Sequence, residues 1–232
     1  MRLGVLAFGD SITNGGGELQ WGVALQSWAL WTARGLGMPY TGFAIDGARV
    51  EDVVEIEIPR FRAVDRGAAY DVGCLYVGVN DVRAVDWDAA AFERSYHQAL
   101  TFIAARAERV LTATIPLDLG RPRAGAKVGE ANAVIERGAS DAGALVIDLR
   151  EFSGRRLLMA DQVHPTAFGQ IAIACKALEM LAADGMEVRA DPWDFVSWEE
   201  TAVGRVRGDA TYAYRRVKEE AKAAARLLRL RF

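Results

Sequence analysis

Leu3-Gly4-Val5-Leu6-Ala7-Phe8-Gly9-Asp10-Ser11-Ile12 is the stretch that decides the fold of this chain. Its apolar run stops abruptly at Gly-Asp-Ser, which is typical of a buried strand that ends at the carboxyl edge of a parallel sheet. Open α/β folds bind their ligands at that edge, so the hydroxyl of Ser11 is a candidate nucleophile. Asp10 and Ser11 are also residues that turns and helix caps favour, and the tripeptide alone leaves both interpretations open.

The composition is that of an ordinary globular protein. A chain of 232 residues is long enough for one α/β domain with a well-buried core and an appendage. Its two cysteines, Cys74 and Cys175, do not make a disulfide framework, and both fall in apolar patterns, so we expect core thiols. The start of the chain lacks a signal-peptide pattern and no apolar stretch is long enough to cross a bilayer, so we expect a cytoplasmic protein.

Hydrophobic periodicity predicts five strands that alternate with helices. This alternation predicts an α/β fold of three layers, α/β/α, in which a five-stranded parallel sheet of flavodoxin-like character carries helices on both faces. A long loop is expected at 116–129. The strands are expected near 3–9, 40–45, 71–79, 110–115 and 145–149, and the helices at 21–35, 49–61 with its end near Pro59, 88–107, 131–143 and from about 166 onward.

Polar residues and glycines follow the predicted strands at the point where each one ends. Ser11, Gly47 and Asn80 follow the first three strands, and Asp161 and His164 come after the last. Acyl transfer needs a hydroxyl, a base that activates it, an anion that orients the base, and donors aimed at the oxyanion. The sequence holds a candidate for each of these roles at one edge of the sheet.

The candidate base is one of only two histidines. His97 lies beside Glu93, Arg94 and Thr101 on the polar face of its predicted helix, where we expect solvent. His164 precedes a proline, which disfavours helical backbone and indicates a loop. Its imidazole can take and return a proton near neutral pH, and the carboxylate of Asp161, three residues earlier, can fold back to Nδ1 and fix the tautomer.

The linked pattern resembles the SGNH, or GDSL, hydrolase family. The similarity rests on Gly9-Asp10-Ser11, a glycine after the second strand, Gly78-Val79-Asn80-Asp81, and Asp161-x-x-His164-Pro165, and it spans roughly residues 3 to 183. The resemblance implies a serine esterase or lipase-like enzyme that forms an acyl-enzyme. It implies Ser11 as nucleophile, His164 as base and Asp161 as its partner, with an oxyanion hole built from Ser11, Gly47 and Asn80.

Two departures from the family pattern concern these blocks. Ile12 stands where the family usually has leucine, an isosteric exchange. Around the second block the family often has an asparagine and a further glycine, whereas this chain has Gly42 and Ala44, so Gly47 is the weakest assignment. The mechanism needs no metal or organic cofactor. The chain has no H-E-x-x-H, no C-x-x-C, no dinucleotide-binding glycine pattern and no P-loop.

Charge divides the chain unevenly. Residues 205–232 carry nine Lys/Arg and three Asp/Glu, whereas the rest carries 19 basic and 28 acidic residues. We expect a hydrolase domain at 1–185 and a helical extension at 186–232, with a basic helix at 211–232. That helix either packs on the domain or frays; a sharper hypothesis is a peripheral contact with an anionic membrane or a partner protein. No recognition motif accompanies the charge, so nucleic acid is not expected as a partner.

The substrate stays open at the level of sequence. The resemblance implies small-molecule, lipid or carbohydrate esters, and equally covers carbohydrate deacetylases, lysophospholipases, thioesterases and O-acetyltransferases. An O-acetyltransferase would use the same triad, and a catalytically silent binding or docking module is the alternative from another functional class. Neither the motifs nor the composition indicates an oligomeric state.

Overall fold

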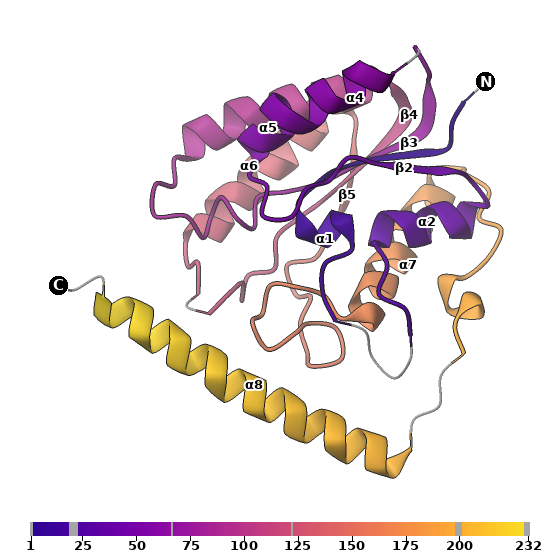
Figure 1. Ribbon diagram of the computed structural model, residues 1–232. Coiled ribbons are helices and arrows are strands. Elements are labelled where there is room, and N and C mark those ends of the chain that lie inside the picture. Colours follow the sequence, from indigo (N-terminus) through magenta and orange to yellow (C-terminus); the bar gives the residue numbers. More distant parts are fainter. Residues whose placement is uncertain (1, 19–22, 66, 122, 198–200, 230–232) are drawn as a thin grey trace.

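A computed structural model of the chain describes residues 2–18, 23–65, 67–121, 123–197 and 201–229, without the side chains of 223 and 226–229. Its centre is a sheet of five parallel strands in the order β2-β1-β3-β4-β5 (Figure 1). The register pairs Leu6 of β1 with Gly73 of β3. The strands are β1 Val5–Gly9, β2 Tyr40–Gly42, β3 Tyr70–Tyr76, β4 Ala107–Ala113 and β5 Leu145–Ile147.

Helices cover both faces of this sheet, as the alternation of patterns predicts (Figure 1). One face carries α2 Trp28–Leu36 and α7 Ala167–Ala183, which pack on each other. The other carries α5 Ala89–Ala104 and α6 Lys127–Ala142, together with a helical run made of α3 Val50–Asp52, η1 Val53–Glu57 and α4 Ile58–Val64. The three-layer α/β/α fold expected from the sequence is therefore confirmed.

Capping side chains set the helix ends that the periodicity placed correctly. Asp88 caps α5 as predicted, because its carboxylate accepts hydrogen bonds from the backbone N–H groups of Ala90 and Ala91. Thr166 caps α7 in the same way through the N–H of Gly169. The aromatic rings of Phe8, Phe43, Phe61 and Phe102 meet between the sheet and the helices of the second face, within the main apolar core.

Several predicted helix boundaries are wrong, and one of them is the end of the helix predicted to reach residue 107, which stops at Ala104 before β4 begins at Ala107. The helix expected from residue 21 begins only at Trp28, because the Ser27 side chain accepts from the N–H groups of Ala29 and Leu30 and caps it there. Pro59 does not end the helix at 49–61: it stands in the first turn of α4, directly after the π-helical η1, where a missing N–H is tolerated. Helix α6 starts at Lys127, one turn before the predicted residue 131.

The C-terminal segment has two parts. Residues 186–196 return along α2 and α7: the N–H groups of Arg189 and Ala190 both donate to the carbonyl of Gly35, and the short 3-10 helix η2 Pro192–Phe195 brings Trp193 against Phe168. Helix α8 Ala202–Arg229 is longer than the predicted helix at 211–232, of which residues 230–232 lie outside the described chain. It crosses the end of the molecule below α1 (Figure 1). Over the described residues, no helix has the length and apolar content needed to span a bilayer.

Candidate active site

Ser11 is held at the end of β1 by a turn that requires glycine at position 9 and is capped by Asp10. Gly9 has φ 141°, and a Cβ there would lie 2.2 Å from the carbonyl oxygen of Tyr76. Asp10 caps the four-residue helix α1 Ser11–Asn14 by accepting from the N–H of Ile12 at 2.9 Å. The turn therefore places Ser11 as the first helical residue at the carboxyl edge of the sheet.

The structure brings Ser11, His164 and Asp161 into one hydrogen-bonded chain. The Oγ of Ser11 lies 3.0 Å from Nε2 of His164, and Nδ1 of His164 lies 2.7 Å from Oδ2 of Asp161. The loop between β5 and α7 supplies both of the latter residues. Ser11 is buried whereas His164 and Asp161 are half-buried, so the site opens to solvent on the histidine side.

The carboxylate of Asp161 also fixes the backbone turn between Asp161 and His164 by accepting hydrogen bonds from it. Oδ1 of Asp161 accepts from the N–H groups of Val163 and His164 at 2.9 and 3.1 Å. This tight turn puts Gln162 in the left-handed region at φ 57°, the one non-glycine residue of the described chain with positive φ. The N–H of Gly120, in the loop before α6, donates to the Gln162 carbonyl at 2.9 Å and supports the turn from outside.

The electrostatics of the pair stabilise the protonated form of His164 and the ionised form of Asp161. The hydrogen bond to Asp161 and its charge raise the pKa of His164 above its usual value, against the effect of burial. Burial by itself would raise the pKa of Asp161, but the His164 side chain and the two backbone donors outweigh it and the pKa is lowered. Asp161 therefore remains ionised across the range in which His164 titrates.

The structure brings Asn80 to the Gly47 turn and joins that turn to α1. Asn80, at the end of β3, donates from Nδ2 to the carbonyl of Ala48 at 3.0 Å, which places its amide beside the Gly47 turn. Asn14 of α1 donates to Oδ1 of Asp46 at 2.9 Å and joins the same turn to the nucleophile helix. Gly47 itself has φ 80°, so the turn favours glycine there although a Cβ would meet no atom within 4 Å.

Sequence reasoning missed a buried acid that joins the first two strand ends. Both oxygens of Glu57 are used: they accept from the backbone N–H of Gly9 at 3.0 Å and of Ile45 at 3.1 Å. Burial raises the pKa of this carboxyl to about 8, against those two hydrogen bonds. Helical spacing could have revealed that Glu57 is buried, because it places this residue on the same apolar side as Val50, Val53 and Phe61.

Two further polar residues support the nucleophile. Asp10, predicted as a turn or cap residue, is fully buried, and burial raises its pKa to about 7. Gln170 of α7 accepts from the N–H of Trp28 at 2.8 Å and donates to the carbonyls of Ile12 and Gly16, so one side chain ties α7 to α2 and to both ends of the nucleophile turn. The sequence analysis did not identify Gln170.

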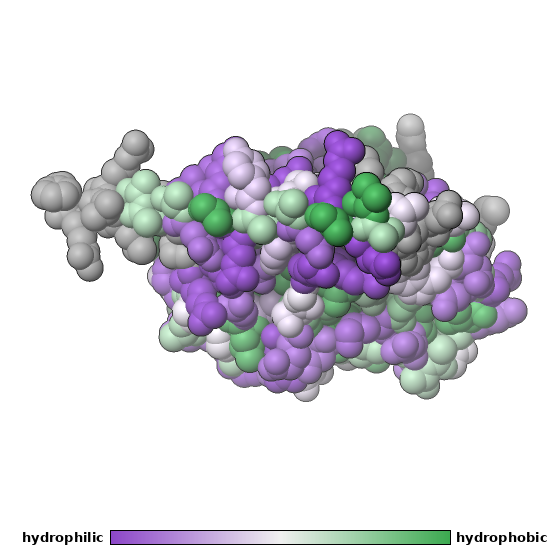
Figure 2. Space-filling view, turned by 90° about the horizontal axis from the view of Figure 1, so that it is seen from below, coloured by the Kyte–Doolittle hydropathy of each residue, from purple (hydrophilic) through white to green (hydrophobic). Residues whose placement is uncertain are grey.

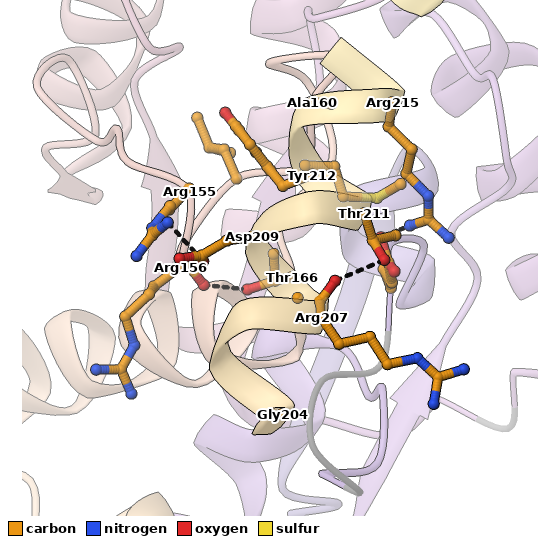
Figure 3. A pocket seen from close by; sticks show the side chains of 14 residues that line it. Arg155, Arg156, Ala160, Thr166, Gly204, Arg207, Asp209, Thr211, Tyr212 and Arg215 are labelled. Carbon is orange, nitrogen blue, oxygen red and sulfur yellow. Dashed lines mark hydrogen bonds and ion pairs between the residues drawn. The ribbon is translucent and has the colours of Figure 1, made fainter. Parts of the chain in front are cut away.

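Helix α8 contacts the loop that carries the base. Tyr212 accepts a hydrogen bond from Nε2 of Gln162 at 3.2 Å, Asp209 pairs with Arg155, and Arg215 pairs with Glu18. These contacts surround a cavity of about 300 Å³ between α8 and the loop, shown in Figure 3. Arg156, Arg207, Thr166 and Thr211 also line it.

The sequence analysis considered three further residues, His97, Cys74 and Cys175. His97 is exposed on α5, as expected. Cys74 is buried as predicted, but Cys175 is only half-buried, and its Sγ lies 3.8 Å from Oδ1 of Asp191, the residue that caps η2. Within the described ranges, no group of three or more His, Cys, Asp or Glu side chains is arranged to hold a metal ion.

Comparison with known proteins adds independent findings. Residues 7–171, more than half of the chain, match the model of the GDSL-like lipase/acylhydrolase family. A member of the lipolytic G-D-S-L family from Veillonella parvula has a similar structure, with a TM-score of 0.62, 22% identity, and coverage of 77% of this chain and 98% of that one. An acetylxylan esterase from Geobacillus stearothermophilus superposes with a TM-score of 0.59 and 20% identity, covering 82% of this chain and all of its own.

The curated proteins include no match to this chain. The solved structures share its fold of a five-stranded parallel sheet with flanking helices, and at these identities they carry only the fold. The family model, in contrast, spans the nucleophile turn, the Asn80 turn and the Asp161 to His164 loop together. This chain belongs to the GDSL-like lipase/acylhydrolase family.

Proposed function

We propose that this protein is a serine esterase that hydrolyses carboxylic esters through an acyl-enzyme. The observation that carries the proposal is the continuous hydrogen-bonded chain from Ser11 through His164 to Asp161, at 3.0 and 2.7 Å. Nucleophile and base within hydrogen-bond reach, with the base oriented by a third group, is the arrangement that activates a serine. Membership of a hydrolase family supports the same reading.

In the first half-reaction, Oγ of Ser11 bonds to the ester carbonyl carbon while Nε2 of His164 takes the hydroxyl proton. The carbonyl π electrons move to oxygen, and the N–H groups of Ser11 and Gly47 and the amide of Asn80 donate to that oxyanion. When the oxyanion collapses, the bond to the leaving oxygen breaks and the alcohol departs with the proton from His164. The acyl group is then bonded to Ser11.

In the second half-reaction, water replaces the alcohol. His164 takes a proton from the water as its oxygen bonds to the acyl carbon, and collapse of the second oxyanion breaks the bond to Oγ of Ser11, which recovers the proton. Asp161 stays ionised and stabilises the imidazolium formed in both steps. All atoms are accounted for by ester, water, acid and alcohol.

As substrates we propose small-molecule or carbohydrate esters. The acetylxylan esterase that shares the fold acts on an acetylated carbohydrate, and its structure covers 82% of this chain. His164 and Asn80 are half-buried, so the site is open to solvent beside them. We place the alcohol part of the ester on this open side. Lipid esters remain within the proposed class, and the chain length of the acyl group is the property that the test should measure.

The test is hydrolysis of p-nitrophenyl esters from acetyl to decanoyl by the wild type, Ser11→Ala and Ser140→Ala, the last being an exposed serine of α6 that serves as control. A fluorophosphonate probe read by intact mass follows the nucleophile directly. We expect turnover and one covalent adduct in the wild type and the control, and neither in Ser11→Ala. A wild type that neither turns over any ester nor takes the probe would contradict the proposal. Transfer to an added alcohol in excess of hydrolysis would assign an acyltransferase instead.

A further inference from the structure

Helix α8 is amphipathic, but its apolar side faces away from the protein. At about 100° per residue, eight described side chains from Val203 to Ala224 fall within about 60° of one direction and form a continuous stripe. The sequence continues this spacing at Leu228. We call these eight residues the outer stripe: Val203, Val206, Ala210, Ala213, Tyr214, Val217, Ala221 and Ala224, all of them exposed.

The side of α8 that meets the protein is small or polar. Its half-buried residues are Gly204, Gly208, Tyr212 and Glu219, whose spacings of four, four and seven place them on the opposite side of the helix from the outer stripe. The contacts with the body are the polar ones of Tyr212 with Gln162, Asp209 with Arg155 and Arg215 with Glu18. The orientation of the helix is thus determined by polar contacts rather than by burial of its apolar side.

This orientation leaves a long apolar strip in solvent. Val203, Val206, Tyr214 and Val217 are 78, 69, 69 and 67% exposed, although a helix on a globular domain normally buries such a stripe. In Figure 2 the hydrophobic residues of α8 form a line along the outermost ridge of the molecule, with hydrophilic residues on both sides. A contiguous exposed apolar strip rimmed by polar residues marks a docking surface.

The charged residues beside the outer stripe indicate whether a second copy of the chain or an anionic surface binds there. On one flank the helix carries Arg207, Lys218 and Lys222, and on the other Arg205 and Arg216 alternate with Asp209 and Glu220. Over residues 202–229 there are eight basic and three acidic side chains. Two copies of α8 packed along their stripes would bring like charges together, whereas an anionic surface would attract them.

We propose that the outer stripe of α8 docks on a lipid surface that contains anionic headgroups. The helix lies in the plane of the interface, with Val203, Val206, Tyr214 and Val217 among the acyl-chain boundary and the flanking Arg and Lys side chains at the headgroups. Because α8 crosses the end of the molecule that carries Ser11 and the Asp161 to His164 loop, the docked protein holds that end at the lipid (Figure 1). Docking does not depend on the proposed chemistry.

The experiment is co-sedimentation of the full chain with vesicles of phosphatidylcholine alone and of phosphatidylcholine mixed with phosphatidylglycerol. We expect binding to the mixed vesicles only, weakened by added salt because exposed charges are screened. The double variant Val206→Ser, Val217→Ser should bind roughly tenfold more weakly, because it removes two apolar side chains without changing charge. The matched control is Val64→Ser, Val85→Ser, two exposed valines outside α8, which should bind like the wild type.

The charge is tested separately. Lys218→Gln with Lys222→Gln should weaken binding several-fold for each residue, since a basic side chain near an anionic surface contributes about 1 kcal/mol. Arg94→Gln with Lys176→Gln, exposed on α5 and α7, is the control of equal charge change. Ser11→Ala should bind vesicles as the wild type does, which separates this proposal from the proposed catalysis.

Two results would overturn the docking proposal. One is equal and negligible sedimentation of the wild type with both vesicle types. The other is a dimer in analytical ultracentrifugation that the Val206→Ser, Val217→Ser variant converts to monomer, because the stripe would then be covered by a second copy. Far-UV circular dichroism should be the same for all the valine, lysine and arginine variants, since each of those substituted side chains is exposed.

Discussion

Asn80 has a side-chain amide with two N–H groups, and one of them donates to the carbonyl of Ala48. In the proposed mechanism the second donates to the oxyanion that forms at Ser11. Removing it with Asn80→Ala should lower kcat about 10²–10³-fold with a small change in KM, because the donor acts on charge that exists only in the transition state. Steady-state kinetics on p-nitrophenyl acetate measure this. A loss of only a few-fold in a folded variant would remove Asn80 from the oxyanion hole.

The acidic limb of the pH–rate profile reports on His164. The base must be neutral to accept the proton of Ser11, so kcat/KM falls as pH drops through the pKa of His164. Because Asp161 raises that pKa, the limb should lie above the usual histidine value of about 6.5. Asp161→Asn removes the charge and should move the limb to lower pH while kcat falls about 10⁴-fold. A limb that Asp161→Asn leaves in place would belong to another group.

At the scale of elements, α8 braces the turn that carries the base. Tyr212 accepts from Gln162, the residue held at φ 57° between Asp161 and His164. Tyr212→Phe removes this hydrogen bond and should lower kcat a few-fold and shift the acidic limb of kcat/KM, because the angle between Asp161 and His164 relaxes. Tyr214→Phe, two residues along on the exposed side of α8, is the matched control and should change neither. Equal kinetics for both variants would exclude a positioning role.

Glu57 makes the joint between β1 and the loop after β2 sensitive to pH. Its folded-state pKa, raised to about 8, exceeds the unfolded value near 4.5, so the folded protein binds this proton more tightly. The stabilisation that comes from protonated Glu57 is complete below the pKa of this carboxyl in the unfolded state. It is lost as the pH rises through its pKa in the folded state. The free energy of unfolding should therefore fall by a few kcal/mol between pH of about 5 and about 8.5. Asp10 and Asp81, with pKa values raised to about 7 and about 6, act in the same direction.

Urea unfolding at several pH values tests this. Glu57→Gln cannot titrate and should flatten the slope, and it should also be less stable at low pH because its amide faces a backbone N–H that the carboxyl oxygen accepted. Glu55→Gln, exposed two residues earlier on η1, should keep the wild-type slope. Parallel slopes for all three proteins would assign the pH dependence to other groups.

At the scale of the whole molecule, the two parts of the C-terminal segment, residues 186–196 and helix α8, differ in how they pack on the domain. A chain that ends at Ser197 loses α8, whose described side chains make polar contacts with the body through Tyr212, Asp209 and Arg215, and should be less stable by about 2 kcal/mol or less. A chain that ends at Gly185 also loses the bonds of Arg189 and Ala190 to Gly35 and the contact of Trp193 with Phe168, and should lose about 3 kcal/mol or more. Urea unfolding of the three chains measures both differences, and equal losses would support the division at 185/186 that the sequence suggests.

The sequence by itself determined the parallel sheet and the place of each proposed catalytic residue. Buried strands produce continuous apolar runs, and parallel strands bring their carboxyl ends to one edge, so Ser11, Asn80 and the Asp161 to His164 loop could be placed together before any coordinates. Helix boundaries were harder to predict, because the cap at Ser27 starts α2 seven residues after the predicted residue 21 and the π-helical η1 carries the helical run past Pro59, and periodicity reveals neither feature.

Only the tertiary structure decided what supports and surrounds that site. Glu57 reaches Gly9 across 48 positions and Gln170 reaches Ile12 across 158, and no local pattern encodes a partner so far along the chain. The orientation of α8 likewise depends on partners that are distant along the chain. Periodicity reveals that the helix has an apolar side, but the side it turns to the protein depends on where Gln162, Arg155 and Glu18 lie once the domain has folded. Those polar partners, remote in sequence, leave the apolar stripe facing outward.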